Sequence, residues 1–106
     1  MAKALIIGRE RVVVDRMLSL IRAEGVDAAG TISDQEAVSQ LESGAIGGLV
    51  IGAGVQEPSR QHLITVAADQ GVAVIRGALA GKDPQVYTRQ ELVPQLREVL
   101  GNSAGR

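Results

Sequence analysis

The chain has 106 residues, of which 45% are hydrophobic and 22% charged, with a formal net charge of −1 at pH 7. This length fits one domain, and the near-neutral charge excludes the strongly basic surface typical of proteins that bind nucleic acid or anionic membranes. Because the chain has no cysteine, disulfides, zinc–thiolate sites and thiol catalysis are also excluded. No apolar run approaches the roughly 20 residues of a membrane span, and the first residues do not resemble a signal peptide, so a cytoplasmic location is expected.

The first half of the chain begins with a strand and a helix. The apolar run ALIIG (4–8) predicts a buried strand that ends at Gly8. A helix to about Glu24 is predicted from one apolar stripe at i, i+3, i+4, i+7 spacing, which consists of Val14, Met17, Leu18 and Ile21. Gly25 ends this helix, because glycine adopts the left-handed conformation without a Cβ penalty. The segment VDAAGTI (26–32) predicts a weaker second strand at an edge of the sheet.

The middle of the chain repeats this alternation. Ser33-Asp34-Gln35-Glu36 is a capping box, which begins a second helix. GLVIG (48–52) predicts the third strand. Pro58 marks the start of the third helix, since its missing N–H needs no intrahelical partner there. That helix ends at Gln70-Gly71, and VAVIRG (72–77) predicts the fourth strand.

Beyond the fourth strand the alternation becomes irregular. The segment ALAGKDP (78–84) is too short and too broken for a full crossover helix, and QVYT (85–88) predicts a short fifth strand. Thr88-Arg89-Gln90-Glu91 has the pattern of a second capping box before the last helix. Pro94 lies within that helix, where it costs on the order of 3 kcal/mol, so a kink or a later helix start is expected. GNSAGR (101–106) predicts a disordered tail.

The alternation of strands and helices predicts a single α/β domain over residues 1–100. Strands that are continuous apolar runs are typical of a parallel sheet buried on both faces, so a three-layer sandwich with right-handed crossovers is expected. The sheet is expected to have four to five strands in the flavodoxin-like order 2-1-3-4-5. Tyr87 is the only aromatic residue, and it is expected either in the core under the last helix or at the rim of a cleft.

In element order and spacing, nearly the whole chain resembles the receiver domain of response regulators. The receiver's chemical motifs are replaced: its acidic pair falls on Gly8-Arg9-Glu10, and its phosphoacceptor aspartate falls on Gly52 or Ala53. The hydroxyl residue that ends the fourth strand falls on Arg76 or Gly77, and Tyr87-Thr88 occupy the place of the receiver's lysine. Because an acyl phosphate needs a carboxylate nucleophile and a magnesium ion held by acids, the resemblance implies a pseudo-receiver that is not phosphorylated.

The glycine-rich junction after the third strand is a candidate ligand site. Gly52-Ala53-Gly54 has the strand-to-helix context of a dinucleotide loop, and Arg76 is placed to suit a 2′-phosphate. Against this, Glu57 occupies the position of the fingerprint's third glycine and would repel a phosphate. The alternative is that the glycines only let the chain turn tightly. The residues expected to bind a small anion or nucleotide are Gly8, Arg9, Gly52, Ala53, Gly54, Arg76 and Gly77.

Other ionisable residues are expected to have ordinary surface roles. His62, the only histidine, is predicted on the solvent face of the third helix rather than in a catalytic site. Arg9 and Arg76 are expected at the carboxyl rim of the sheet, where they either hold an anion or pair with acids such as Glu10 and Glu57.

These features predict a non-catalytic, pseudo-receiver-like module for regulation or protein interaction. The resemblance to receivers implies a homodimer or a partner protein at the fourth strand, residues 78–88 and the last helix. The alternative is a small Rossmann-like domain that binds a nucleotide or anion at the glycine junction. No nucleophile, base and orienting residue can be assembled from the sequence, so no enzymatic activity, metal or cofactor is expected.

Overall fold

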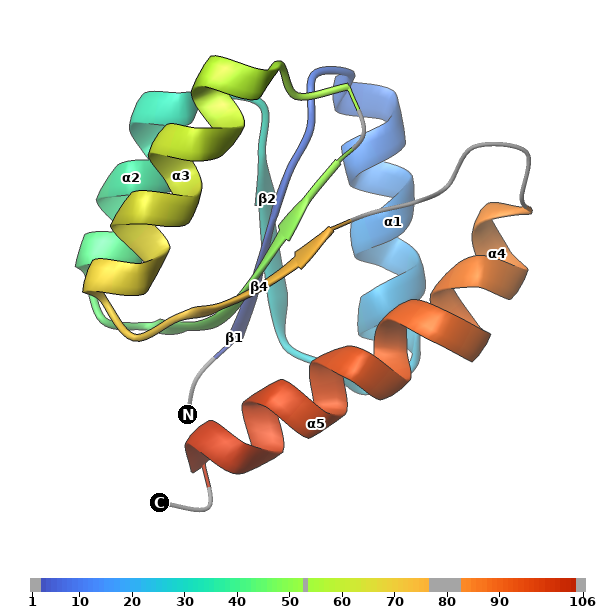
Figure 1. Ribbon diagram of the computed structural model, residues 1–106. Helices are drawn as coiled ribbons and strands as arrows, with labels where there is room; N and C mark the ends of the chain where they lie inside the picture. Colours follow the sequence, from blue (N-terminus) through green and yellow to red (C-terminus); the bar gives the residue numbers. More distant parts are fainter. Residues whose placement is uncertain (1–2, 53, 77–82, 105–106) are drawn as a thin grey trace.

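A central parallel sheet organises the chain in the computed structural model, which describes residues 3–52, 54–76 and 83–104. The described strands are β1 (Lys3–Ile7), β2 (Ala28–Thr31), β3 (Ile46–Ile51) and β4 (Ala73–Arg76). They lie in the order β2-β1-β3-β4, and every neighbouring pair is parallel (Figure 1). This confirms the predicted α/β fold and the strand order 2-1-3-4, with β2 at an edge.

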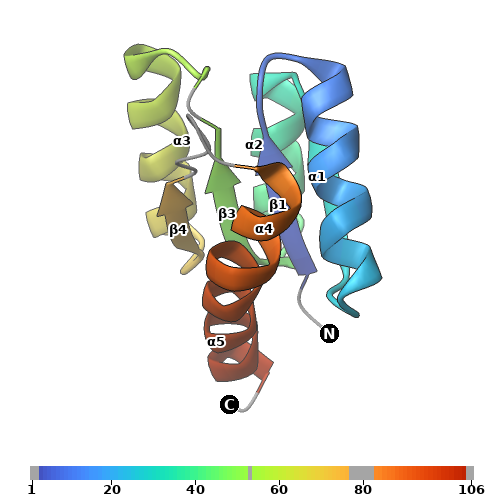
Figure 2. The ribbon, with the colours of Figure 1, turned by 90° about the vertical axis from the view of Figure 1, so that its right-hand side faces the viewer.

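Helices cover both faces of the sheet. The helical elements are α1 (Arg11–Ala23), α2 (Asp34–Glu42), α3 (Glu57–Asp69), α4 (Pro84–Tyr87), the π-helical turn η1 (Thr88–Leu92) and α5 (Val93–Ala104). α2 and α3 lie on one face, and α1 lies with α4 and α5 on the other (Figures 1 and 2). The result is the three-layer sandwich that the sequence predicts. None of the helices in the described ranges has both the length and the hydropathy to cross a membrane.

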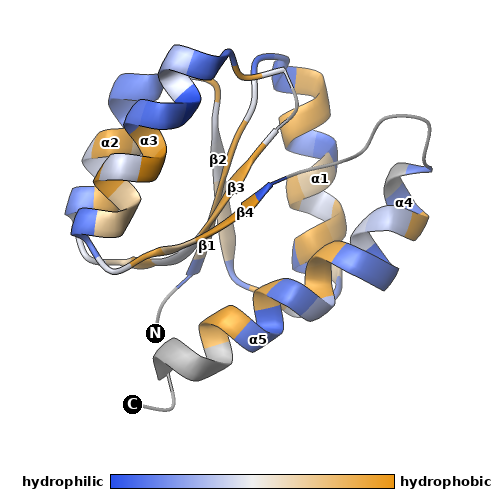
Figure 3. Cartoon of the chain, in the orientation of Figure 1, coloured by the Kyte–Doolittle hydropathy of each residue, from blue (hydrophilic) through white to orange (hydrophobic). Residues whose placement is uncertain are grey.

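The alternation of side chains along β1 builds two cores. Ala4 and Ile6 are buried against α1 and α5, whereas Leu5 and Ile7 are buried against α2 and α3. This follows from the two-residue period of a strand, which sends successive side chains to opposite faces. Both faces of the central strands are apolar, and Figure 3 shows β3 and most of β4 in the hydrophobic colour, whereas each helix combines hydrophobic and hydrophilic stretches.

The helix boundaries in the first three-quarters of the chain follow the predicted capping residues. The Ser33 hydroxyl accepts a hydrogen bond from the Glu36 amide at 3.3 Å, which confirms the N-cap of α2. In a capping box the amide of Ser33 would donate to the Glu36 carboxylate. Here it donates instead to the hydroxyl of Thr31 on β2, at 3.0 Å. Gly25 and Gly71 have φ values of 85° and 71°, which confirms them as the left-handed residues after α1 and α3.

The predicted fifth strand at 85–88 is wrong, because this segment is helical. Asp83 begins the helix: its carboxylate accepts hydrogen bonds from the amides of Gln85 at 2.8 Å and Val86 at 3.4 Å. Pro84 follows at the start of α4, where its missing N–H loses no helical bond. An aspartate N-cap followed by proline is a strong signal for a helix start, and it outweighs the strand preference of the short segment that follows.

The predicted capping box at Thr88 is also wrong, since Thr88 lies within a continuous helical run and is 1% exposed. The run passes through η1 directly before Pro94. A π-helical turn is a common way for a helix to accommodate an interruption of its hydrogen bonding, and a proline interrupts it by lacking an N–H. α5 then continues to Ala104, so residues 101–104, which were predicted to belong to a tail, are helical.

Candidate functional site

The two central strands, β1 and β3, both end in glycine at the same edge of the sheet. Gly8 follows β1 and Gly52 follows β3, and the Gly52 amide donates a hydrogen bond to the Ile7 carbonyl at 2.8 Å. The chain leaves β1 toward β2 on one side and leaves β3 toward β4 on the other. This is the topological switch point of the sheet, the place where open α/β proteins bind their ligands.

A pocket of about 460 Å³ lies at this switch point. We call it the glycine cleft, and the described residues that line it are Gly8, Arg9, Glu10, Val13, Val14, Gly52 and Gly54. The glycines come from two segments that are far apart in the sequence, Gly8 after β1 and Gly52 with Gly54 after β3, and their adjacency was expected from the parallel order of the strands.

The three glycines differ in what the surrounding structure requires. A Cβ at Gly8 would lie 2.9 Å from Cγ2 of Val14, and one at Gly52 would lie 3.3 Å from the Ile7 carbonyl oxygen, so close packing restricts both positions. A Cβ at Gly54 would meet only the Arg9 Cβ, at 3.9 Å, and Gly54 does not have a left-handed φ. Among the described residues, neither packing nor backbone conformation therefore requires glycine at position 54.

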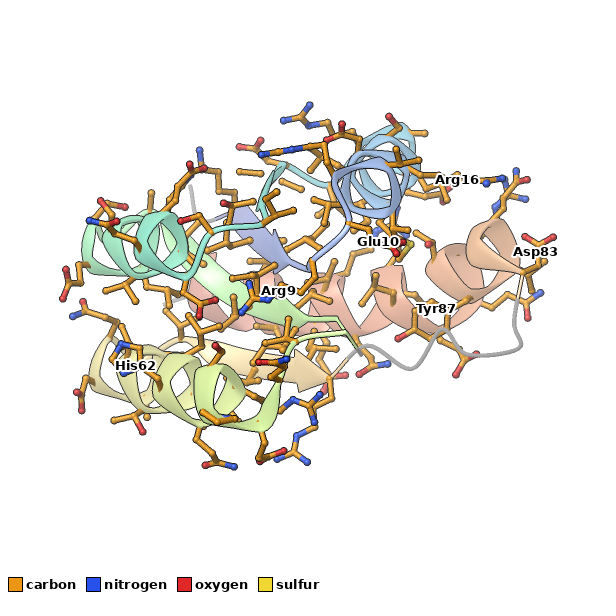
Figure 4. The ribbon with its side chains drawn as sticks, turned by 90° about the horizontal axis from the view of Figure 1, so that it is seen from above. Arg9, Glu10, Arg16, His62, Asp83 and Tyr87 are labelled. Carbon is orange, nitrogen blue, oxygen red and sulfur yellow. The ribbon has the colours of Figure 1, made fainter. Side chains whose placement is uncertain are left out.

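Arg9 lines the cleft, but its guanidinium is directed away from it. Nη1 donates to the Ile32 carbonyl at 3.0 Å, and Nη2 donates to Oδ1 of Asp34 at 2.7 Å. The expected alternatives for Arg9 were an anion or a pair with an acid such as Glu10 or Glu57, but it pairs instead with Asp34 at the start of α2. Figure 4, which looks down on this edge of the sheet, shows Arg9 on the side of α2 and α3 and Glu10 on the side of α1.

The Arg9–Asp34 pair belongs to a polar cluster that the sequence did not predict. Ser59 on α3 also hydrogen-bonds the Asp34 carboxyl, and His62 on α3 contributes a favourable charge interaction. Partial burial acts to raise the pKa of Asp34, but the Ser59 and Arg9 hydrogen bonds and the Arg9 and His62 charges together hold it below its ordinary value. Asp34 is therefore a weak proton acceptor, and the cluster is better suited to joining β1, α2 and α3 than to acid–base chemistry.

A second pocket lies beside this cluster, between α2 and α3. Its volume is about 370 Å³, and the described residues lining it are Asp34, Gln35, Val38, Ser39, Glu42 and His62. His62 is exposed, as predicted for the solvent face of α3. Within residues 3–52, 54–76 and 83–104, no three His, Cys, Asp or Glu side chains are grouped to hold a metal ion.

The remaining predicted site residues are not part of the described cleft. Arg76 is the last residue of β4, pairs in register with Ile51 and is exposed, but it is not among the described residues that line the cleft. Ala53 and Gly77 lie outside the described residues. Glu57 is engaged along its own helix, where it accepts a hydrogen bond from Gln61 at 2.7 Å and lies 3.7 Å from Arg60.

The sheet order and the position of the cleft together define a Rossmann-like, flavodoxin-like α/β domain. Among solved structures, the chain is similar to the solution NMR structure of a de novo designed Rossmann 2x3 fold protein, with a TM-score of 0.66 over 90% of this chain and 91% of that one. The two sequences are 13% identical, so this likeness concerns the fold alone. No protein-family model matches the sequence, and no curated protein matches it.

Proposed function

We propose that the protein is a non-catalytic regulatory module that binds a small molecule in the glycine cleft. The observation that carries this proposal is the cleft itself, because it lies between the diverging strands β1 and β3 where this class of sheet binds ligands. Gly54 adds support, since it lines the cleft and none of the described neighbouring residues requires a glycine there. Because glycine has no side chain, a ligand can approach the backbone closely at this position.

The resemblance to receiver domains supports a regulatory role without phosphorylation. In a receiver, the ends of the first and third strands carry the carboxylates that hold magnesium and accept the phosphoryl group. Here the corresponding positions include Gly8 and Gly52, and both line the cleft. A ligand that binds in the space vacated by those side chains would replace phosphorylation as the signal of this module.

The described residues that line the cleft favour binding over chemistry. They combine three glycines and two valines with Arg9 and Glu10, and Arg9 is already paired with Asp34. Nucleophilic or acid–base catalysis needs a nucleophile within hydrogen-bond reach of a base that a third group orients. The cleft residues supply a surface for recognition and no such arrangement.

A thermal-shift screen of small molecules tests this proposal. A ligand at 100 times its Kd stabilises the folded state by about 2.7 kcal/mol, which is easily measured for a domain of this size. Gly54→Val should weaken binding of any such ligand at least tenfold while the far-UV circular dichroism stays unchanged. Ala68→Val adds the same side chain at an exposed position of α3 and should bind as the wild type does. Binding that is insensitive to Gly54→Val would contradict the proposal.

Self-association through β4 is a second candidate function, favoured by the position of this strand. β4 pairs with β3 on one side, and no described strand pairs with its other edge. An exposed strand edge is a template for pairing with another chain, and a second copy can pair with it symmetrically. Sedimentation velocity should then show a dimer at high micromolar concentration, and a monomer throughout that range would count against this candidate.

A further inference from the structure

A narrower apolar pocket opens beside the glycine cleft and extends toward the core. We call it the apolar slot; its volume is about 180 Å³, and it shares Gly8, Gly52, Gly54 and two valines with the cleft. The described residues that form its apolar walls are Ile6 and Ile7 of β1, Val13, Val14 and Met17 of α1, Val50 of β3, Tyr87 of α4 and Leu92 of η1. The slot therefore lies between α1 and the helical run from α4 into η1, on the α1 face of the sheet.

From this slot we infer the class of ligand: a small, uncharged amphipathic molecule whose apolar ring enters the slot and whose single polar group stays in the glycine cleft. This inference rests on the proposed function and adds the chemistry of the ligand to it. Cavities of roughly 150 Å³ with aliphatic and aromatic walls accept a benzene-sized group. The slot is of that size and lining, and it is continuous with the switch-point cleft.

The charges around the cleft favour an uncharged polar group. Glu10 lines the cleft with a carboxylate that repels an anion, and the Arg9 guanidinium is paired with Asp34 at 2.7 Å. A hydroxyl or carbonyl group in the cleft meets Glu10 without the repulsion that a phosphate would meet.

The protein carries its own reporter of the slot. Tyr87 is the only aromatic residue of the chain, is 3% exposed and lines the slot, so intrinsic fluorescence comes from this wall alone. Met17, which is 7% exposed, supplies a second signal through its methyl group in a ¹³C-methyl-methionine spectrum. Cyclohexanol is a suitable probe, because it has one ring and one hydroxyl and does not absorb where tyrosine does.

Titration with cyclohexanol should give a saturable change in Tyr87 fluorescence and a matching shift of the Met17 methyl signal. Val13→Phe adds bulk to a wall shared by the slot and the cleft and should weaken binding at least tenfold. Val12→Phe is the matched control, since Val12 is the neighbouring residue of α1, is 79% exposed and is not among the lining residues. Its affinity should equal that of the wild type.

Inorganic phosphate and AMP, titrated in parallel, separate the two proposals. If either shifts the amide signals of Gly8, Gly52 and Gly54 while cyclohexanol leaves Tyr87 and Met17 unchanged, the inferred ligand class is overturned and the proposed cleft remains. If neither the anions nor cyclohexanol nor the screened compounds bind, both proposals are overturned. Equal weakening by Val13→Phe and Val12→Phe also overturns the slot, because the effect would then not be local to it. If Val13→Phe fails to fold, the Met17 methyl signal of the wild type still shows whether cyclohexanol enters the slot, and an unchanged signal overturns the inference.

Discussion

Val14 is enclosed by two glycines, and a methyl group added at one of them should destabilise the fold. Val14 is 2% exposed. A Cβ at Gly30 would lie 2.7 Å from its Cγ1 atom, and a Cβ at Gly8 would lie 2.9 Å from its Cγ2 atom. A valine within a helix has one strongly preferred χ1 rotamer, so Val14 cannot easily turn aside. Gly30→Ala must therefore displace α1 relative to β2 or strain the valine.

The expected loss of stability follows from two opposing effects. Overpacking of a well-packed core costs roughly 1–3 kcal/mol, and the lower entropy of the unfolded chain after a Gly→Ala change offsets about 0.4–1 kcal/mol. The net loss should be about 1–2 kcal/mol, and each kcal/mol lowers Tm by roughly 4–8 °C in a domain of this size. Urea and thermal unfolding followed by circular dichroism measure both quantities.

A double-mutant cycle assigns the effect to this contact. Val14→Ala removes both γ-methyl groups, so Gly30→Ala should cost much less in that background, with a coupling energy of about 0.5–3 kcal/mol. Gly54→Ala is the control, because a Cβ there meets its nearest neighbour at 3.9 Å, and its stability should stay within about 0.5 kcal/mol of the wild type. The reasoning is refuted if Gly30→Ala is as stable as the wild type, or if its effect adds to that of Val14→Ala.

Three further predictions concern the polar cluster, the cap of α2 and the missing phosphorylation chemistry. The pKa of Asp34 is lowered in the folded state, so its stabilising effect is complete above the unfolded pKa of about 3.9 and is lost as the pH falls through the folded value. Since the Asp34 side chain is 35% exposed, Asp34→Asn should cost only about 0.2–1 kcal/mol at pH 7; a stability difference that persists at pH 2 would contradict this. Ser33→Ala should cost about 1 kcal/mol by removing the cap of α2, whereas an unchanged urea midpoint would mean that the hydroxyl contributes nothing. Incubation with acetyl phosphate and magnesium should leave the intact mass unchanged, and a gain of one phosphate on an acidic residue would show that a phosphoacceptor is present.

Much of the fold could be predicted from the sequence because its determinants are local. The apolar runs that become β1 and β3, the Ser33 cap and the glycines after α1 and α3 each act within a few residues. The prediction failed for QVYT (85–88), which was expected to be a short strand and is helical. The deciding residues, Asp83 and Pro84, lie just before that segment and start the helix.

The site could be predicted only in part, because some of its features follow from the order of the strands and others depend on how the helices pack. The position of the strand-end glycines follows from the sheet order, which brings Gly8 beside Gly52 through backbone pairing alone. The partner of Arg9 does not follow from the sheet order. The sequence predicts Asp34 in the first turn of α2. Only the packing of α2 beside β1 brings its carboxylate within 2.7 Å of the Arg9 guanidinium. The apolar slot likewise depends on α4, since the segment that contains Tyr87 was predicted to be a strand and is helical.

The place of β1 in the sheet has a consequence for how the molecule opens. β1 is the first element along the chain, yet it lies between β2 and β3 and pairs with both. Separation of Lys3–Ile7 would break two ladders and expose side chains from both cores. The amides of β1 should therefore exchange with solvent only when the whole domain unfolds, and they are expected among the most protected of the described residues.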